Sequence, residues 1–565
     1  MLQQHIPLLD LAGKINSMKR LLVSLAVLSI LATSLQSKKY FFHAQIGNDE
    51  NIGTSILAPF KSLAKIPLLK IGAGDTLLLA AGQVFKGTLH LKNIKGTREK
   101  PILITTYRVG PRGVLAAAEI DASGYANGIQ LLNCSFIKVE ELSIRANGGG
   151  LIDRESDQVK MRCGVLVQIT EEGEYEHISL RRLCIADIFY EEKGFERGKK
   201  EVRTANGTQK YGWGIRVINR TKHAKLREVL IRECQVENVA HTGIKLTGGE
   251  RNIESFLIED CEIRVTGGPG MQMSGVNEGR VRHNYISHSG STDDSRKWGR
   301  GSGLWTWGSR DVVIEHNQFL FANGPGDSAG CHIDFNCENI VVQYNLSANN
   351  AGGFCEILGN NYNCAYRYNI SINDGHRVKG ENGAFQEGKT FWLSGFAGRK
   401  KPRKGPFNSY FYNNTIVVDT NIVAKMAIDR AADGMLIMNN IFCIRGESAW
   451  VLGDQYKPDK GGAHQIKRVV FKNNLFLKDG NWPVDGWIQP EDKSFGSPQW
   501  ETANLQDIFQ WIPTDKPLIQ GKGLPISKIP GDSIGLTIGL AVEYDILGQA
   551  ILGTPSLGAI HIPEN

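Results

Sequence analysis

A short phrase built around one asparagine recurs along the chain, and it constrains the fold more than any other feature. Typical copies read VRHNYI, IEHNQF, VQYNLS and YRYNIS, while two earlier copies, IRECQV and IEDCEI, carry cysteine at the same point. The copies are centred on Cys234, Cys261, Asn284, Asn317, Asn345, Asn369, Asn414, Asn440 and Asn474. Their spacing varies, from 23 residues between Cys261 and Asn284 to 45 between Asn369 and Asn414. Self-similarity of this kind is typical of a repeat architecture with insertions between fixed elements.

Each repeated unit holds two or three short apolar or alternating runs, and the repeated region has no helical stripe. Such a unit cannot bury its own apolar face, whereas stacked units can, and their strands then pair in parallel about 4.8 Å apart. An asparagine at the same turn of every coil can hydrogen-bond to its copies above and below. The sequence therefore predicts an all-β fold, a parallel β-helix with an internal asparagine ladder.

Two terminal segments carry a resemblance to a known family. They are GNDENIGTSILAPFKSLAKI (47–66) followed by GDTLLL (74–79), and the closing PSLGAI (555–560). With the repeats between 45 and 478, the chain resembles the right-handed parallel β-helix proteins of the pectate-lyase-like superfamily. The resemblance implies a right-handed solenoid with an N-terminal helical cap and an irregular C-terminal cap, in a secreted carbohydrate-active protein. It is specific for fold and much less so for chemistry.

The N-terminal region reads as an export signal. Met18-Lys19-Arg20 forms a basic head, Leu21 to Leu31 an apolar run, and Ala32 to Ser34 a stretch of small residues, which is the pattern of a signal peptide that begins at Met18. The apolar run is too short to span a bilayer comfortably. We expect a signal region over 1–44, a β-helix over 45–480 and a C-terminal cap over 481–565, in a secreted or periplasmic monomer without stable membrane insertion.

The charge and the cysteines of the chain limit the kinds of partner and cofactor that we expect. A net charge of +7 over 565 residues is scattered except for GRKKPRK at 398–404, which we interpret as a solvated loop, so no nucleic-acid partner is expected. The ten cysteines fall mostly inside strand-like runs, where buried free thiols are expected, and no cysteine or histidine spacing indicates zinc. No cofactor or metal is expected.

One face of the predicted coils is rich in polar and aromatic residues. We take Gly243, Gly270, Gly303, Gly330, Gly352 and Gly383 as the glycines that open the strands. The residues two positions after them are Lys245, Gln272, Trp305, His332, Phe354 and Phe385. The residues four positions after the same glycines are Thr247, Ser274, Trp307, Asp334, Glu356 and Glu387. The residues between them are mostly apolar, so both sets should face outward. Acids placed only to keep an open sheet soluble would be interleaved with Lys or Arg, so this strip indicates a functional cleft.

Aromatic rings stack on sugar rings and carboxylates act on glycosidic bonds, so the strip predicts a polysaccharide substrate and a glycoside hydrolase. On adjacent coils, Asp334 and Glu356 should have Cα atoms one strand spacing apart, and crowding should raise one pKa. By resemblance to β-helical glycosidases, Asp334 is the nucleophile and Glu356 the acid/base, with retention expected for a carboxyl separation of about 5 to 5.5 Å. Glu387, about 10 Å from Asp334, suits an inverting pair better. The predicted substrate contacts are Trp305, Trp307, His332, Phe354, Phe385, Lys245 and the loop acid Asp327.

Two alternatives stay open. A polysaccharide lyase would use a basic residue to abstract a proton, with Ca²⁺ held by the clustered acids. Its candidate bases are Lys245, His332, His376, Arg377 and Lys389. A non-catalytic carbohydrate-binding or structural β-helix would need the aromatic residues but has less use for three neighbouring acids. The acidic and aromatic centre of the strip favours hydrolysis over elimination.

Overall fold

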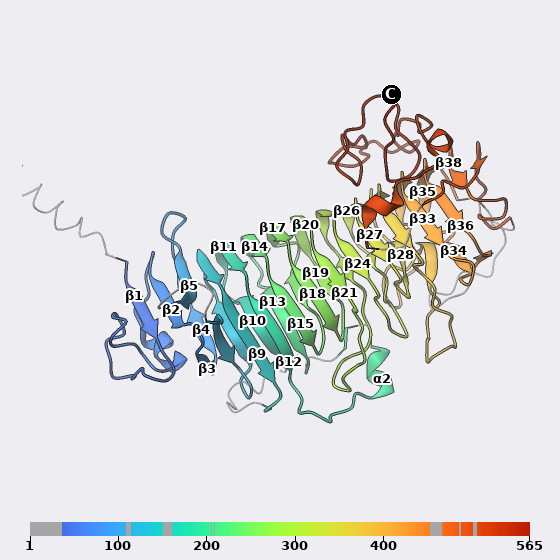
Figure 1. Ribbon diagram of the computed structural model, residues 1–565. Coiled ribbons are helices and arrows are strands. Elements are labelled where there is room, and N and C mark those ends of the chain that lie inside the picture. The colour runs from blue at the N-terminus through green and yellow to red at the C-terminus, as the bar shows by residue number, and fades with distance from the viewer. Residues whose placement is uncertain are drawn as a thin grey trace, which may run out of the picture.

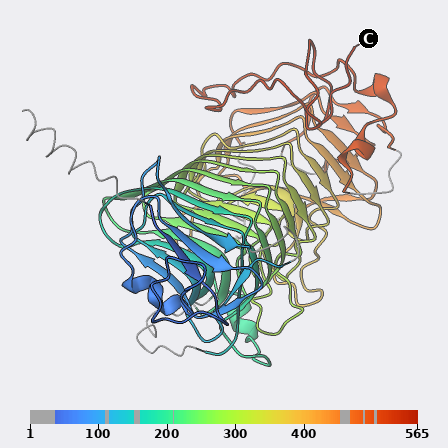
Figure 2. The ribbon, with the colours of Figure 1, turned by 60° about the vertical axis from the view of Figure 1, so that its left-hand side comes forward.

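The chain winds into an elongated solenoid of three parallel β-sheets (Figures 1 and 2). This computed structural model describes residues 37–108, 115–150, 161–204, 206–207, 210–451, 466–484, 488–500 and 506–564. Residues 1–36, which include most of the predicted signal region, lie outside the described residues. Within the described ranges every strand pair that joins successive coils is parallel, as the predicted β-helix requires.

The three sheets run the length of the solenoid, and each coil adds one strand to each sheet. The first sheet contains β1 (Lys39–Phe42), β2 (Thr76–Ala80), β5 (Ile102–Tyr107), β8 (Ile137–Glu140), β11 (Gly173–Arg181), β14 (Ala224–Arg232), β17 (Ile253–Glu259), β20 (Val276–Arg282), β23 (Arg310–Glu315), β26 (Glu338–Gln343), β29 (Ala365–Arg367), β32 (Phe407–Tyr412), β35 (Asp433–Met438) and β38 (Val469–Lys472). The second sheet contains β4 (Leu89–Lys92), β7 (Asn127–Leu132), β10 (Arg162–Ile169), β13 (Gly212–Asn219), β16 (Ile244–Gly248), β19 (Met271–Ser274), β22 (Leu304–Trp307), β25 (Cys331–Ile333), β28 (Gly353–Ile357), β31 (Lys389–Leu393), β34 (Ala424–Ile428) and β37 (Ser448–Trp450). The third sheet contains β3 (Val84–Lys86), β6 (Ala118–Asp121), β9 (Leu142–Asn147), β12 (Cys184–Phe189), β15 (Gln235–Val239), β18 (Glu262–Thr266), β21 (Tyr285–Ser287), β24 (Gln318–Leu320), β27 (Leu346–Ala348), β30 (Ile370–Ile372), β33 (Thr415–Val418), β36 (Ile441–Ile444), β39 (Leu475–Phe476) and β40 (Ser494–Phe495). The helical elements are η1 (Leu63–Leu68), α2 (Lys199–Val202), η3 (Ile508–Trp511) and η4 (Lys516–Leu518).

The predicted asparagine ladder is confirmed. The backbone N–H of Asn284 donates to Asn317 Oδ1 at 3.0 Å, and the Asn284 amide donates to the same oxygen at 2.9 Å. The same double contact repeats coil by coil until Asn474. Each ladder residue follows one in the left-handed region, such as His316 at φ 53°, so the turn between the first and third sheets exposes backbone groups that the asparagine amides satisfy.

The cysteines at the start of the ladder extend it as buried thiols. Cys261 donates its backbone N–H to Asn284 Oδ1 at 3.0 Å. All ten cysteines are free, and nine are buried, whereas Cys184 is exposed. The prediction of buried free thiols is therefore confirmed for all but Cys184, whose side chain faces outward from β12.

Close packing explains the glycines that open strands of the second sheet. A Cβ placed on Gly243 would lie 2.7 Å from the carbonyl oxygen of Gly270, and one on Gly270 would lie 2.7 Å from that of Gly303. Side chains other than hydrogen therefore do not fit in this column. Inside the coil, aromatic rings stack from one coil to the next, as Tyr366 does on Phe411 with ring centres 5.7 Å apart.

The ends of the solenoid differ. At the N-terminal end the expected helical cap is a single 3₁₀ turn, η1, which buries Leu63 and Ile66. At the C-terminal end the ring of Trp482 packs against aromatic side chains of the last coils, including Phe471 at 4.7 Å between ring centres. The pairing of β39 with β40 continues the third sheet past residue 480.

The C-terminal tail, residues 506–564, packs along the flank of the last coils (Figure 1). Asp532 accepts a hydrogen bond from Asn363 Nδ2 at 2.8 Å, and the carbonyl of Gly539 accepts one from Arg367 at 2.7 Å. Apolar side chains of the tail also pack on outward residues of the first sheet and of the third sheet, so the tail covers these two faces and not the outer face of the second sheet. Among the described residues no helix is long and apolar enough to cross a membrane.

Candidate active site

The outward side chains of the second sheet form the predicted strip. Strand register places Arg216, Lys245, Gln272, Trp305 and His332 in one column, each opposite its neighbour in the next coil. A second column, two residues further along each strand, contains Thr247, Ser274 and Trp307 and continues to Asp334. The alternation predicted from the glycine anchors is correct as far as β25.

The prediction fails at the next coil, where the register differs by two residues. Ile333 pairs with Ile357 and Ala329 with Gly353, so Glu356 lies opposite His332 and not opposite Asp334. The Cα atoms of Asp334 and Glu356 are diagonal neighbours, about 7 to 8 Å apart, and not one strand spacing apart as expected. The glycine column had suggested Gly352 as the equivalent of Gly330, but Phe354 occupies that position.

Phe354 is accordingly not a substrate contact. Its ring is fully buried inside the coil, 5.3 Å from the ring of Tyr366 and 6.4 Å from that of Phe319. The close packing found at Gly243 and Gly270 therefore does not extend to this coil.

Phe385 and Glu387 also depart from their predicted places, because Gly383 lies in the loop before β31 and opens no strand. The ring of Phe385 packs under the guanidinium of Arg300, 5.2 Å away, and outside the cavity described below. Glu387 does line that cavity, but from the loop, where it forms an ion pair with Lys425 at 2.9 Å.

The strip is the floor of a cavity of about 1090 Å³. Five carboxylates line it: Asp327, Asp334, Glu356 and Glu387 at one end and Glu250 at the other. The other predicted contacts that line it are Lys245, Trp305, Trp307 and His332. Lining residues that were not predicted as substrate contacts include Trp213, Arg216, Gln272, Gln386, Trp392 and Phe396. Arg216 and Gln272 follow from the glycine-based alternation, but the loop residues carry no signal in the repeat pattern.

A salt bridge fixes Asp327 in its loop. Arg300 donates from Nε to Asp327 Oδ2 at 2.8 Å and from Nη2 to Oδ1 at 3.0 Å, a bidentate geometry that holds a carboxylate firmly. Arg377 binds the carbonyl of Asp327 at 2.9 Å. Asp327 and Ser328 both have left-handed backbones, at φ 50° and 63°, so two arginines hold the loop in a conformation that costs free energy.

The insertion before β22 is buried from residue 296 to residue 303, although Asp293 and Ser295 are exposed. Arg300 is only 4% exposed, and the ring of Trp298 stacks on His241 with centres 4.6 Å apart. Arg300 also binds the carbonyl of Arg203, just after α2, at 2.9 Å. The insertion therefore supports Asp327 from behind.

The acids of the cavity have opposite electrostatic environments. Burial raises the pKa of Asp334 to about 8 and the charge of Asp327 adds to the rise, although Asp334 accepts a 2.9 Å hydrogen bond from the Phe335 N–H. Burial, with Asp327 and Asp334 nearby, also raises the pKa of Glu356 to about 8 against the opposing charge of Lys389. Burial would raise the pKa of Asp327 as well, but the guanidinium of Arg300 outweighs it and lowers that pKa. Protonated and ionised carboxyl groups therefore coexist near neutral pH.

Aromatic side chains and a neutral histidine surround the acids. The ring of Trp305 stacks on His332, with centres 5.9 Å apart at 16°. Burial lowers the pKa of His332 to about 4, so its imidazole is neutral at pH 7. Trp307 is 38% exposed and packs edge-on against Phe335, leaving a ring face available to a sugar.

Of the residues considered for elimination, Lys245, His332 and Arg377 line the cavity, whereas Lys389 and His376 are not among its lining residues. Lys389 lies over the ring of Trp392 at 3.8 Å and interacts electrostatically with Glu356. His376 binds the carbonyl of Asn373. In the part of the chain that the structure describes, no group of three or more His, Cys, Asp or Glu side chains is placed to hold a metal ion.

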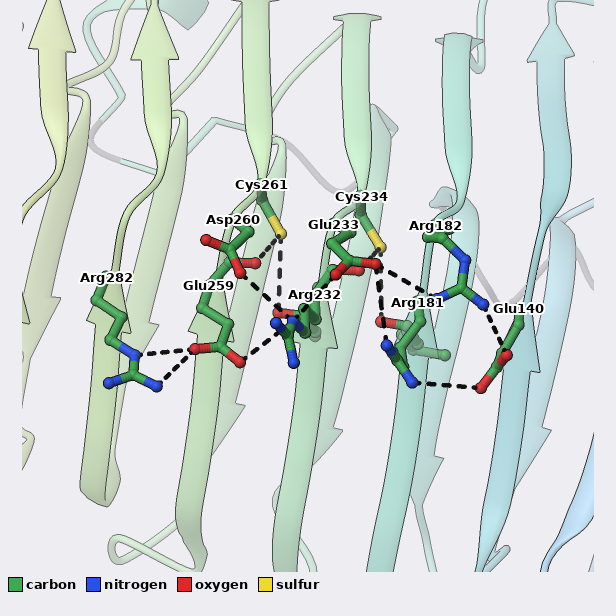
Figure 3. A network of polar contacts seen from close by, with 12 residues as sticks. Glu140, Arg181, Arg182, Arg232, Glu233, Cys234, Glu259, Asp260, Cys261 and Arg282 are labelled. Carbon is green, nitrogen blue, oxygen red and sulfur yellow. Dashed lines mark hydrogen bonds and ion pairs between the residues drawn. The ribbon is translucent and has the colours of Figure 1, made fainter.

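Charge on the first sheet is ordered differently from charge in the cavity. There, acids lie opposite arginines on neighbouring coils: Glu140 faces Arg181, and Glu259 lies between Arg232 and Arg282 (Figure 3). Where Arg181 and Arg232 face each other, Glu233 lies 3.9 Å from Arg181. Arg282 donates to Glu259 at 2.9 Å. In the cavity like charges lie together instead, which a sheet surface built only for solubility does not require.

Comparisons with known proteins agree with the fold. A family model described as a right-handed beta helix region matches residues 213–416. The chain is 24% identical over 625 residues to a lacto-N-biosidase of Bifidobacterium longum subsp. longum, a match that covers 94% of this chain and 36% of the relative. The chain thus spans about a third of the length of that curated relative.

Solved structures give the same architecture. The native GH136 lacto-N-biosidase from Eubacterium ramulus superposes with a TM-score of 0.52 at 20% identity, over 73% of this chain and 68% of that one. Its selenomethionine derivative gives 0.50 at 20% identity, over 72% and 68%. The protein has the fold of a right-handed parallel β-helix, as its sequence predicted.

Proposed function

We propose that the protein is a glycoside hydrolase that acts on an oligosaccharide or polysaccharide. The observation that carries the proposal is the group of acids in the tryptophan-lined cavity: Asp334 and Glu356 have raised pKa values beside the ionised Asp327. Hydrolysis of a glycosidic bond needs one protonated and one ionised carboxyl group on either side of the bond. The likeness to a lacto-N-biosidase supports the same class of reaction.

In the proposed mechanism the reactive form has Glu356 protonated and Asp334 ionised, which is a minor form at neutral pH because the pKa of Asp334 is raised to about 8. In this form Asp334 attacks the anomeric carbon while Glu356 protonates the glycosidic oxygen. A bond forms between Asp334 and the sugar as the glycosidic bond breaks, and the departing sugar leaves with the proton of Glu356. Water then attacks the anomeric carbon, gives a proton to Glu356 and frees Asp334, which restores both groups. The Phe335 N–H stabilises the ionised form of Asp334, as a nucleophile requires.

Asp327 acts through its charge in this mechanism. Its carboxylate raises the pKa of both Asp334 and Glu356 and so helps keep a proton in the site at neutral pH. It is also the competing candidate for proton transfer, because it lines the same cavity. Substrates whose leaving group needs no proton show whether Glu356 or Asp327 is the residue that transfers the proton.

The first test incubates the purified chain with a panel of glycans and aryl glycosides, including lacto-N-biosides, while reducing ends and the ultraviolet absorbance of unsaturated uronides are followed together. New reducing ends without an ultraviolet rise support hydrolysis. A rise in ultraviolet absorbance would mean elimination. If glycans bind but neither signal changes, the protein is a non-catalytic carbohydrate-binding protein.

The second test assigns roles by substitution. Asp334→Asn should abolish turnover on every substrate, whereas Glu356→Gln should spare aryl glycosides whose leaving group needs no proton. If Asp327→Asn shows that selective sparing and Glu356→Gln does not, the acid is Asp327. Asp492→Asn, at an exposed position, is the matched control.

We also propose that the chain is exported, on the basis of the basic and apolar pattern that begins at Met18. N-terminal sequencing of the protein recovered from outside the cytoplasm should start after the small residues at 32–34. Recovery of the uncleaved chain in the cytoplasm would contradict the proposal.

A further inference from the structure

We propose that the end of the cavity formed by β13 and β16 is a subsite for an anionic group of the bound glycan, either a carboxylate or a sulfate ester. Its ligands are Arg216, Lys245 and Arg220, which all line the cavity. The inference rests on the proposed function, because it takes the bound molecule to be a glycan. It goes beyond that function by naming the chemical class of substrate.

Two of these three cations, Arg216 and Lys245, are buried and have no acidic partner among the described residues, whereas Arg220 is exposed. Arg216 is 4% exposed and Lys245 is 8% exposed. Within the described residues no acceptor lies within hydrogen-bond distance of Nε or Nη1 of Arg216. Buried charges are normally paired, so two unpaired cations that face a cavity indicate a missing anion.

The charges also repel one another. Arg216 and Lys245 are opposite each other on adjacent strands, a placement of like charges that destabilises a sheet. Burial, with the charges of Arg216 and Arg220, lowers the pKa of Lys245 well below its ordinary value. Glu250 lines the same end, but it is exposed and is not among the groups that influence Lys245.

The shape of the group suits a planar or tetrahedral anion. The guanidinium of Arg216 lies over the ring of Trp213 at 4.5 Å, which holds the fork flat while Nε and Nη1 remain unbonded. A guanidinium in this state can bind two oxygens of one carboxylate or sulfate. Lys245 supplies a second, rounder charge from the next coil.

The subsite is remote from the acids. Lys245 on β16 is three strand steps from β25, the coil of Asp334, which corresponds to about 14 Å. Gln272 and Trp305 occupy the column between them. The anionic group therefore belongs to a sugar ring some way along the chain from the bond that is cleaved, and it governs which glycan binds.

The test measures binding separately from catalysis. The full chain is titrated calorimetrically with sodium glucuronate, sodium sulfate and glucose at constant ionic strength. Glucuronate or sulfate should bind and glucose should bind at least tenfold more weakly. Lys245→Met and Arg216→Met should each lower the anion affinity at least tenfold, whereas Lys86→Met, at an exposed position on β3, should leave it unchanged. Because sulfate stabilises folded proteins generally, only an effect lost in the first two variants supports the subsite.

Oligosaccharides distinguish the two anions. Asp334→Asn protein is titrated with a uronate-containing oligosaccharide, a sulfated oligosaccharide and the neutral form of each. Tighter binding of one acidic form, abolished by Lys245→Met, identifies the group. Equal affinity for acidic and neutral forms, or unchanged preference in both cation variants, would overturn the proposal.

The outcomes separate this inference from the proposed function. Anion binding that depends on Lys245 in a protein without hydrolytic activity would retain the subsite and contradict the hydrolase. Hydrolysis of neutral glycans with no anion binding would support the hydrolase and contradict the subsite. Lys245→Met should unfold at or above the melting temperature of the native chain, because it removes an unpaired buried charge; a lower melting temperature in both cation variants would mean that the cations are structural.

Discussion

Replacing Asp334 with asparagine should stabilise the protein at alkaline pH and leave its stability unchanged at pH 4. The carboxyl is ordinary in the unfolded chain, with a pKa of 3.8, and burial raises that pKa to about 8 in the folded protein. Folding therefore favours the protonated form. The stability cost is absent below the unfolded pKa, grows as pH rises between the two values and is complete above the folded pKa.

The size of the effect follows from the shift. One pKa unit corresponds to about 1.4 kcal/mol, so a rise of about four units corresponds to a cost on the order of 5 kcal/mol above pH 8. Glu356 titrates with Asp334, so the two costs are shared and do not add. The asparagine side chain of the variant carries no charge at any pH, and the variant should therefore escape this cost.

Scanning calorimetry of both proteins from pH 4 to 9 measures the difference. In a chain of more than 250 residues, each kcal/mol moves the melting temperature by less than about 2 to 4 °C, so the gap should open gradually to several degrees as the pH passes 8. Asp492→Asn, at an exposed site, is the control and should show a constant offset. A gap that is the same at pH 4 and pH 9, or a substituted protein that is less stable at pH 9, would refute the argument from burial.

Three further predictions concern the acids, the ladder and the aromatic floor. Asp327→Asn removes a negative neighbour, so it should lower the pKa of Asp334 and Glu356 and move the alkaline limb of the kcat/KM profile to lower pH; an unmoved limb would mean that Asp327 does not act through charge. In the native enzyme that limb should lie near pH 8, because activity falls as the proton donor ionises. Asn345→Ala breaks the ladder and leaves the Asn317 N–H and the Ile314 carbonyl without the partner that the amide supplies, which should cost about 1 to 3 kcal/mol per group in denaturant unfolding; unchanged unfolding would show that water replaces the amide. Trp305→Ala should weaken glycan binding by about 1 kcal/mol or more in calorimetry, and equal affinity would exclude Trp305 as a sugar platform.

The repeat pattern predicted the solenoid because the feature that builds it is local. Each asparagine follows a left-handed residue at a fixed turn, and its partner is its own copy in the next coil. Such a ladder needs no knowledge of distant segments. For the same reason the alternation of Lys245, Gln272, Trp305 and His332 could be predicted from the sequence.

The register after β25 could not be predicted, because the glycine used as an anchor is not the feature that sets it. Gly352 and Gly330 look equivalent in sequence, yet backbone pairing between Ala329 and Gly353 shifts the coil by two residues. A shift of two keeps the alternation along the strand, so Glu356 still faces the cavity. Phe354, however, takes the position of the strand-opening glycines, where its side chain is buried inside the coil. Pattern alone cannot detect an error that preserves the alternation.

The contacts between the loops of the site could not be predicted from the sequence, for a different reason. Arg300 and Asp327 are 27 residues apart, and their pairing depends on how two insertions fold against α2. The repeat pattern predicts the strands but gives no information on how the insertions between them fold. Asp327, predicted as a substrate contact from its loop, lines the same cavity as the other acids, and its role stays a prediction.

The separation of the two ends of the cavity leads to a last prediction. Lys245 and Asp334 lie on coils three strand steps apart, about 14 Å, and substitutions more than about 10 Å apart with no shared partner usually add within about 0.5 kcal/mol. Lys245→Met should therefore lower glycan affinity by the same factor in the native protein and in Asp334→Asn, and it should leave the alkaline limb of the pH profile in place. A coupling above about 0.5 kcal/mol in this double-mutant cycle would show that one bound anion reaches both ends. The cations would then act on the sugar that is cleaved, and their role would be catalytic and not selective.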